Sequence, residues 1–208
     1  MAKRIFITAT NTDVGKTYAS MLLLKEFSDR GYKVGVFKPI ETGVTDKPID
    51  GEKLFNLAKE LNPSLATLDL DTIVPYQFEL PAAPIVAKKD KNINVNFLEH
   101  KLQEIEKYCD LVIIEGAGGL LVPVEEHLNM IDFIDIFQAS PFLVCPSKLG
   151  SINDTALSRY LLESKNINYT WAINIHQDKD TFEEVTAPFY KNNFLTLQKD
   201  IKTIANKL

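Results

Sequence analysis

Cysteine is scarce in this chain of 208 residues, which has only Cys109 and Cys145. Both lie beside or within apolar runs, and neither belongs to a CxxC pair or to a metal-ligand spacing. This scarcity excludes a disulfide framework and a cysteine-based metal site. We therefore expect two buried thiols in a reducing compartment.

Long apolar runs and an excess of positive charge are missing as well. No stretch approaches the roughly 18 apolar residues of a membrane-spanning helix, and the apolar stretch at the N-terminus is too short for a signal peptide. The formal net charge is -5, which argues against broad binding to nucleic acids or anionic membranes. We expect a cytoplasmic protein without nucleic-acid or membrane partners, in which a few local cations suffice to bind a nucleotide.

Hydrophobic residues make up 45% of the chain and charged residues 25%, an ordinary globular mixture. The length suits one α/β domain over residues 1–208. Short apolar runs alternate with amphipathic segments. The expected strands cover residues 3–9, 33–37, 111–114, 141–145 and 169–175. The expected helices cover residues 16–30, 52–61, 95–108, 129–139 and 153–164, with a further helical tail after residue 181. Residues 62–93 are rich in proline and predict turns, one strand and a short helix.

This alternation predicts a mostly parallel sheet of the P-loop NTPase type, with helices on both faces. In such sheets ligands bind at the carboxyl ends of the strands. The motifs that carry chemistry are therefore expected directly after the predicted strands.

A phosphate-binding loop is indicated after the first strand. Residues 10–17 read T-N-T-D-V-G-K-T and fit the P-loop pattern G-x-x-x-x-G-K-[ST], except that Thr10 replaces the first glycine. Backbone N–H groups of such a loop hold phosphate oxygens, Lys16 neutralises the β- and γ-phosphates, and Thr17 ligates Mg²⁺. A chance G-K-T in a turn is the alternative, which the strand–loop–helix context disfavours. The predicted nucleotide contacts from this segment are Thr12, Asp13, Val14, Gly15, Lys16, Thr17 and Tyr18.

A second lysine, Lys38, follows the second expected strand in F-K-P-I-E-T-G. By itself it is more often a solvated surface lysine, but its place beside the P-loop strand favours the phosphate site. Two lysines suit a phosphoryl-transfer transition state, in which charge spreads over the γ-phosphoryl oxygens. We therefore predict catalytic roles for Lys16 and Lys38.

An acidic metal ligand is indicated by L-V-I-I-E-G-A-G-G, a buried strand followed by Glu115 and an expected glycine-rich turn. This is the logic of a Walker B strand, with glutamate in place of aspartate. The glycines of this turn, residues 116–119, would let the backbone approach a ligand closely. Asp50 is a second candidate carboxylate, for which a helix N-cap is the competing interpretation.

Residues 146–153, P-S-K-L-G-S-I-N, follow another expected strand and open a helix. Free N–H groups at a helix start suit a carboxylate. Ordinary capping by Ser151 or Asn153 is the alternative.

These motifs occur together and in order: T-x-T-D-V-G-K-T, F-K-P-I-x-T-G, V-I-I-E-G-A-G-G and K-L-G-S-I-N. The set resembles the dethiobiotin synthetases of biotin biosynthesis over residues 3–175, with residues 62–93 matching loosely. The combination is specific although each motif alone is not.

The resemblance implies an ATP-dependent cyclo-ligase and homodimer that joins CO₂ or bicarbonate to 7,8-diaminopelargonate. The substrate carbamate attacks the γ-phosphate, and the second amine then closes a cyclic urea, with ADP and phosphate as the other products. The resemblance implies Mg²⁺ ligands at Thr17, Asp50 and Glu115. It also implies nucleotide contacts at Gly116, Ala117, Gly118 and, with the base, Asn174. The implied substrate contacts are Lys38, Thr42, Gly150, Ser151, Ile152 and Asn153, the last four at a dimer interface.

The chain departs from the family at three points. Ala9 stands where the family commonly has glycine. The loop before Asp50 is short, so Asp46 is a rival for the metal. Residues 181–208 lack the proline-containing segment that helps hold adenine, which predicts weakened selection of the nucleotide base.

Three other interpretations compete with the synthetase. Another amide-forming P-loop synthase would carry a glutamine amidotransferase domain, for which the chain has no room. A partitioning-type switch ATPase has a signature lysine early in the P-loop, where this chain has Asn11. A non-catalytic nucleotide-binding protein would not need two lysines and a metal carboxylate.

Overall fold

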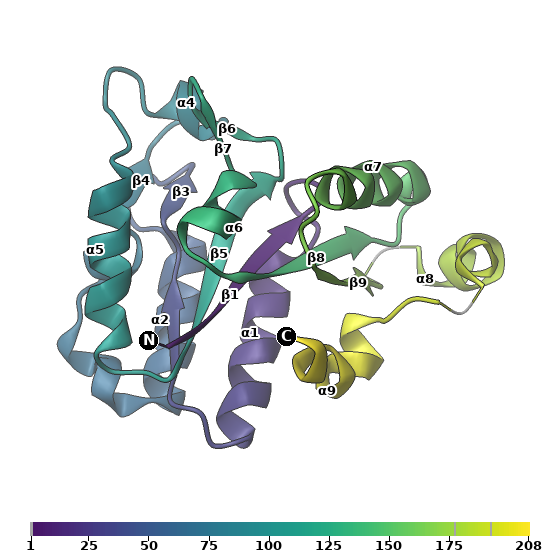
Figure 1. Ribbon diagram of the computed structural model, residues 1–208, viewed down its shortest axis with the longest axis horizontal. Coiled ribbons are helices and arrows are strands. Elements are labelled where there is room, and N and C mark those ends of the chain that lie inside the picture. Colours follow the sequence, from purple (N-terminus) through teal and green to yellow (C-terminus); the bar gives the residue numbers. More distant parts are fainter. Residues whose placement is uncertain (1, 177, 192) are drawn as a thin grey trace.

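The computed structural model describes residues 2–176, 178–191 and 193–208. A five-stranded sheet with the order β2-β5-β1-β8-β9 lies at its centre, and every neighbouring pair of strands is parallel (Figure 1). The strands are β1 (Lys3–Ala9), β2 (Val34–Phe37), β5 (Leu111–Gly119), β8 (Ser140–Pro146) and β9 (Thr170–Asn174). They are almost continuously apolar, as strands covered on both faces must be. The expected mostly parallel sheet is confirmed.

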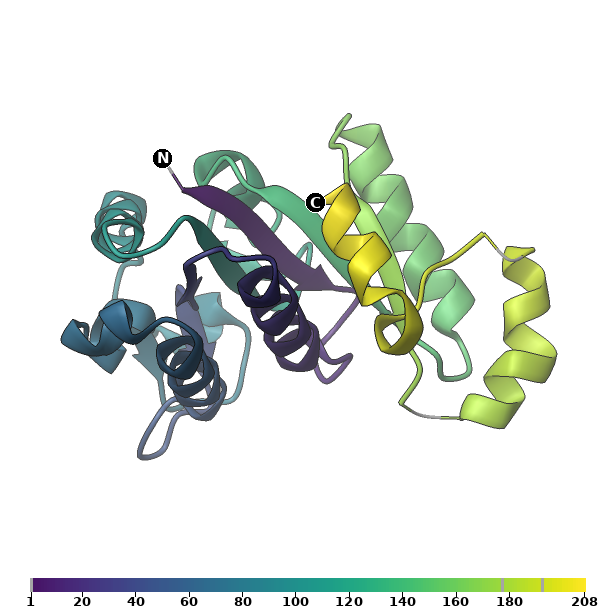
Figure 2. The ribbon, with the colours of Figure 1, turned by 90° about the horizontal axis from the view of Figure 1, so that it is seen from below.

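Helices cover both faces of this sheet (Figure 2). One face carries α1 (Lys16–Asp29), α2 (Ile49–Leu61) and α9 (Leu197–Lys207). The other carries α5 (Val95–Glu106), α6 (Asp132–Ile136) and α7 (Ser151–Ser164). The connection from β1 to β2 runs one way along the sheet and those from β5 to β8 and β9 run the other way. Right-handed crossovers therefore place their helices on opposite faces.

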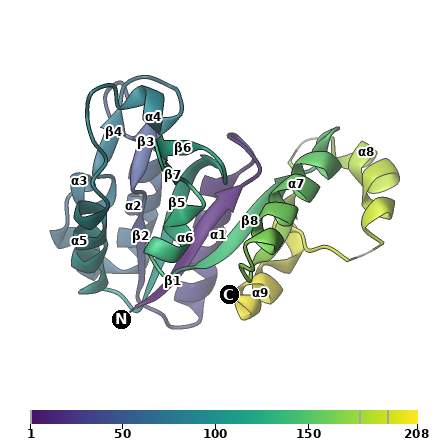
Figure 3. The ribbon, with the colours of Figure 1, turned by 45° about the horizontal axis from the view of Figure 1, so that its top comes forward.

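Two small strand pairs lie beyond the carboxyl end of the main sheet (Figure 3). In one, β3 (Ile40–Thr42) runs parallel to β4 (Tyr76–Phe78). In the other, β6 (Pro123–Glu125) runs antiparallel to β7 (Leu128–Asn129). The proline-rich region also forms a 3₁₀ turn at Pro63–Thr67 and the short helices α3 (Leu70–Ile73) and α4 (Pro84–Ala87). It therefore has one strand, as expected, but more helical turns than expected.

The C-terminal segment leaves the sheet after β9 and later returns to it. It forms α8 (Lys179–Thr181), a π-helical turn at Phe182–Thr186 and a 3₁₀ turn at Ala187–Tyr190, which project from the body in Figures 1 and 3. The chain then pairs again with β9, where the Ile173 N–H donates to the Leu195 carbonyl at 2.8 Å. The expected helical tail is thus interrupted, and α9 follows the return.

Three expected elements had a boundary that was wrong by three residues or more. The turn expected after Ile114 is instead a continuation of β5, because β1 pairs with it as far as Gly119. The expected helix 129–139 shrinks to α6 because Asn129 pairs with Pro123 in the hairpin. Helix α2 begins three residues earlier than expected, at Ile49.

Both cysteines are buried free thiols, as expected. Within the described part of the chain, no helix combines the length and the apolar character needed to cross a bilayer.

Candidate active site

A cavity of about 580 Å³ lies at the carboxyl ends of β1, β2 and β9. It collects most of the residues that the sequence motifs singled out. The predicted residues that line it are Thr12, Asp13, Gly15, Lys16, Thr17, Tyr18, Lys38, Thr42, Asp50, Ala117, Gly118 and Asn174. Residues of the P-loop, of the lysine motif and of the glycine-rich segment after Glu115 therefore meet at one edge of the sheet, whereas those of K-L-G-S-I-N do not line the cavity.

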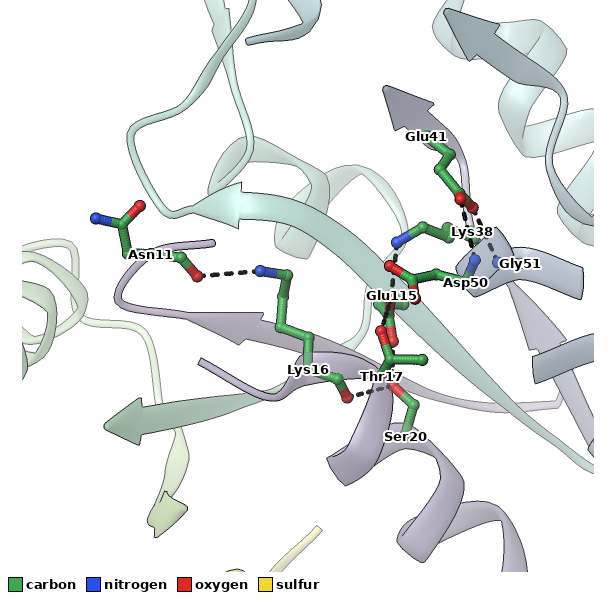
Figure 4. A network of polar contacts seen from close by, with 9 residues as sticks. All are labelled: Asn11, Lys16, Thr17, Ser20, Lys38, Glu41, Asp50, Gly51 and Glu115. Carbon is green, nitrogen blue, oxygen red and sulfur yellow. Dashed lines mark hydrogen bonds and ion pairs between the residues drawn. The ribbon is translucent and has the colours of Figure 1, made fainter. Parts of the chain in front are cut away.

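The P-loop connects β1 to α1 through a left-handed residue, Gly15, with φ +103°. A Cβ there would lie 2.1 Å from the Asn174 Nδ2 atom, so glycine is required by both the backbone and the packing. The Lys16 ammonium donates to the Asn11 carbonyl at 3.1 Å within the loop (Figure 4). Burial, and then the nearby charge of Lys38, lower the pKa of Lys16 to about 8.

Glu115 is fully buried behind the cavity wall and joins the two lysine-bearing elements. One carboxylate oxygen accepts from Lys38 Nζ at 2.7 Å and from Thr17 Oγ1 at 3.0 Å. The other accepts from Ser20 Oγ at 2.7 Å (Figure 4). The carboxylate thus ties the start of α1 to the end of β2.

The Lys38–Glu115 ion pair is shielded from solvent, because the Lys38 side chain is only 5% exposed and the Glu115 side chain is not exposed. Burial by itself would lower the pKa of Lys38, but the charge and hydrogen bond of Glu115 outweigh it and raise that pKa. Lys38 therefore stays charged. Taken as a single residue it was expected on the surface, and its position after β2 reverses that expectation.

Of the two candidate metal carboxylates, Asp50 lines the cavity, whereas Asp46 is exposed and does not. Asp50 lies in the first turn of α2 and is not its N-cap, which is Pro48. The N-cap interpretation of Asp50 is therefore wrong. The backbone N–H groups of Asp50 and Gly51 donate instead to Glu41, at 3.0 and 2.9 Å (Figure 4).

The far end of the cavity is formed by β9 and the returning C-terminal segment. The Asn174 amide donates to the Val14 carbonyl at 2.9 Å and accepts from Gln198 Nε2 at 2.7 Å. His176 also lines this end, and its Nδ1 lies 3.2 Å from the Asn174 carbonyl. The C-terminal segment, which lacks the proline-containing stretch typical of the family, therefore reaches this end through Gln198.

Some predicted residues do not line the cavity. Val14, Glu115 and Gly116 are buried just behind its wall. Gly150, Ser151, Ile152 and Asn153 lie at the start of α7 and contribute nothing to the lining within one chain. Neither Ser151 nor Asn153 caps α7 through a side-chain hydrogen bond, and Gly150 occupies the N-cap with φ +87°.

Four lining residues were not identified from the sequence: Ile40, Glu41, His176 and Gln198. Ile40 and Glu41 lie within the lysine motif, so the motif itself signalled their position but not their role. Gln198 had no local signal, because only the pairing of Thr196 with β9 brings α9 to the cavity. Ser20, which bonds Glu115, lies one turn after the P-loop threonine.

The oxygen donors around Thr17 fit Mg²⁺, which prefers hydroxyl, carboxylate, phosphate and water oxygens. Thr17 and Asp50 line the cavity, and the carboxylate of Glu115 accepts from the Thr17 hydroxyl behind the cavity wall. Among the described residues, no group of three or more His, Cys, Asp or Glu side chains forms a metal cage. This composition suits an ion shared with nucleotide phosphates.

Proteins that are similar in sequence include ATP-dependent enzymes, which agrees with a phosphate-binding loop at the cavity. A family model described as an AAA domain matches residues 3–203. The ATP-dependent dethiobiotin synthetase BioD of Sulfurovum sp. is 44% identical over 186 residues, covering 89% of this chain and 89% of that protein. The corresponding proteins of Wolinella succinogenes and Escherichia coli O157:H7 are 38% and 33% identical, covering 91% and 84% of this chain and 88% and 78% of their own lengths.

Solved structures with a similar fold are more distant in sequence. The MinD cell division protein of Aquifex aeolicus has a TM-score of 0.53 at 17% identity, covering 99% of this chain and 87% of that chain. A plasmid partition protein of Borrelia burgdorferi has a TM-score of 0.55 at 15% identity, covering 100% of this chain and 96% of that chain. At these identities the likeness shows the fold alone.

Proposed function

The chain belongs to the family of ATP-dependent dethiobiotin synthetases, and from this premise we propose the full reaction and the residues that perform it. The enzyme is an ATP-dependent ligase that makes dethiobiotin. We propose that it joins CO₂ to 7,8-diaminopelargonate within one synthetase domain over residues 1–208, in the cytoplasm.

The proposed reaction has three steps. One substrate amine combines with CO₂ to form a carbamate, and a carbamate oxygen attacks the γ-phosphorus of ATP while ADP leaves. The second amine then attacks the carbonyl carbon of the carbamic-phosphoric anhydride. Phosphate leaves with the bonding electrons, and a cyclic urea remains. The cavity of about 580 Å³ is lined both by P-loop residues that suit phosphates and by Thr42, the proposed substrate contact.

The observation that carries the proposal is the convergence of Lys16 and Lys38 on one cavity beside a buried carboxylate. Lys38 is held rigidly by Glu115, so it is preorganised for negative charge that grows on the transferring phosphoryl group. Lys16 exchanges its loop carbonyl partner for phosphate oxygens when a nucleotide binds. The two ammonium groups thereby stabilise the transition state of transfer more than its ground state.

We propose that Thr17, Asp50 and Glu115 hold Mg²⁺ together with the nucleotide phosphates. The ion supplies further neutralisation of phosphate charge. Ser20 and Lys38 orient Glu115, and the P-loop N–H groups orient the nucleotide. The proposed nucleotide contacts also include Thr12, Asp13, Val14, Gly15, Tyr18, Gly116, Ala117, Gly118 and Asn174.

Thr42 lines the cavity at the end of β3 and is the proposed substrate contact near Lys38. Residues 150–153 form a helix start whose N–H groups suit a substrate carboxylate. Since they do not line the cavity of their own chain, we propose a homodimer in which they serve the partner's cavity.

The reaction is tested by incubating the protein with labelled bicarbonate, Mg²⁺-ATP and 7,8-diaminopelargonate. We expect acid-stable label that forms only when both ATP and the diamine are present, together with equimolar phosphate. ATP hydrolysis without fixed label would contradict the proposed substrates and favour a switch ATPase.

A further inference from the structure

Helix α2 begins without a cap of its own. Its N-cap residue, Pro48, has no side chain that can accept a hydrogen bond, and the helix start has no side-chain cap from the flanking residues. An N-cap side chain usually accepts from the second and third helical N–H groups. Here those groups belong to Asp50 and Gly51.

Glu41 performs this capping from a different element. It lies on β3, and its two oxygens accept one N–H each, from Asp50 at 3.0 Å and from Gly51 at 2.9 Å (Figure 4). A carboxylate at a helix N-terminus also interacts favourably with the helix dipole. The first turn of α2 is therefore fixed to β3 by a bidentate, charge-assisted contact.

The packing around this contact leaves the helix start little freedom. A Cβ at Gly51 would lie 2.1 Å from Val74 Cγ2 and 3.2 Å from Glu41 Oε2. Glu41 is 8% exposed and lines the cavity together with Lys38 and Asp50. One of the two hydrogen bonds is thus donated by the backbone N–H of Asp50 itself, whose carboxylate is the proposed metal ligand.

We propose that Glu41 is a positioning residue for the metal–nucleotide site: it anchors the first turn of α2 and thereby aims Asp50. It acts through Asp50, because its two oxygens hold the backbone N–H groups of Asp50 and Gly51. The inference rests on the proposed role of Asp50 and extends it to a residue of a different element.

The test measures how much Mg²⁺ strengthens ADP binding, by calorimetry with Mg²⁺ and with EDTA. In the wild-type protein, Mg²⁺ should clearly raise the affinity for ADP, and this increase in affinity is called the Mg²⁺ gain. Glu41→Gln keeps the size but offers one acceptor oxygen instead of two, so the gain should fall by about tenfold while affinity in EDTA stays unchanged. An unchanged gain in Glu41→Gln, or no gain in the wild type, would overturn the proposal.

Action through Asp50 is tested by a double-mutant cycle. Asp50→Asn should also reduce the gain, and adding Glu41→Gln to it should cause no further loss. Additive losses would overturn the proposal and would make Glu41 a direct ligand. This binding measurement does not depend on dethiobiotin synthesis, so failure of the proposed reaction and failure of the Glu41 role are distinguishable.

A rescue and a control separate positioning from stability. In Glu41→Ala, the further change Pro48→Ser supplies a local cap and should restore most of the Mg²⁺ gain. The control is Asp69→Ala, which removes the cap of α3, where Asp69 accepts from the Thr72 N–H at 2.7 Å. It should lower the melting temperature and leave the Mg²⁺ gain unchanged. Failure of the rescue, or an equal loss of gain in the control, would contradict the proposed role.

Discussion

Lys38 lines the cavity, and its ammonium group also neutralises the buried carboxylate of Glu115. Its effects on stability and on turnover can therefore be measured separately. Removing one partner of a buried pair leaves an uncompensated charge, which is far more costly than loss of an exposed pair. Lys38→Ala should therefore lower the free energy of unfolding by about 3–5 kcal/mol. Urea unfolding measures this. Lys47→Ala is the control, since the Lys47–Glu52 pair is exposed and its loss should leave stability unchanged. Equal stability of the two variants would contradict the stabilising role of the buried Lys38–Glu115 pair.

Turnover gives a second residue-scale prediction. Lys16→Ala and Lys38→Ala should each lower turnover by at least about 100-fold, since each removes a positive charge that we propose acts mainly in the transition state. Phosphate release under saturating substrates measures the effect, with folding checked by circular dichroism. Unchanged turnover in Lys38→Ala would refute its catalytic role.

The two thiols should be unreactive in the folded protein. Burial raises the pKa of Cys109 to about 12 and that of Cys145 to about 12. The thiolate is the reactive form, so at pH 8 both groups are protonated as well as inaccessible. Ellman's reagent should label neither cysteine until urea unfolds the chain, and then label both. Rapid labelling of the native protein would show that the core is open.

At the scale of elements, the P-loop packs closely against β9, where Asn174 lies next to Gly15. Gly15→Ala introduces a Cβ that would lie 2.1 Å from Asn174 Nδ2 and also strains a positive φ. We expect nucleotide affinity to fall by about tenfold or more, since such strain costs about 1–3 kcal/mol. Calorimetric titration with ADP measures it.

The control for this change is Gly31→Ala. Gly31 has φ +88°, but a Cβ there meets no atom within 4 Å. It carries the same backbone strain far from the loop, so it should lower stability and leave nucleotide affinity unchanged. Equal affinity losses in the two variants would attribute the effect to general destabilisation.

The C-terminal element leads to a prediction about base selection. Asn174 uses one donor and one acceptor of its amide on Val14 and Gln198, which leaves few polar atoms to distinguish one base from another. We expect ATP, GTP and CTP to support turnover with kcat/KM values within about tenfold of one another, because little base-edge hydrogen bonding is available. Competition kinetics measures these values. A large preference for ATP would show that the returning segment restores adenine recognition.

At the scale of the whole molecule, a homodimer with shared sites predicts complementation. Lys16→Ala is expected to inactivate a chain's own cavity. Asn153→Asp places a negative charge at the exposed helix start that is proposed to serve the partner, and it is expected to inactivate the partner's cavity. When the two inactive variants are co-expressed, about a quarter of wild-type activity should return, because random pairing leaves one intact site in half of the dimers. Absence of recovery would contradict the shared site. Asn94→Asp, at the start of α5, is the control and should remain active.

Much of the architecture follows from local pattern. The apolar runs of β1 and β8 and the helical spacing of α1 are strong enough to mark these elements within a residue or two. Motifs that follow parallel strands were expected at the same edge of the sheet. For this reason the motifs themselves indicated the places of Lys16 and Lys38, whereas Asn174 was implied only by the family resemblance.

Contacts between segments that are far apart in the chain could not be predicted from the amino-acid sequence. The continuation of β5 through Gly119 depends on its pairing with β1, and the glycines there otherwise signal a turn. The arrival of Gln198 depends on the return of the chain to β9. The capping of α2 by Glu41 depends on β3 and α2 lying side by side, which no periodicity encodes.

The amino-acid sequence by itself therefore determined the parallel α/β fold, the phosphate loop and the chemical identity of the lysines and carboxylates. These follow from hydrophobic periodicity and from short motifs within single elements. The tertiary structure alone decided that Asp50 and not Asp46 lines the cavity, that Glu115 is buried against Lys38, and that Glu41 holds the helix start. These depend on distances between segments far apart in the chain, which are set only when the core packs.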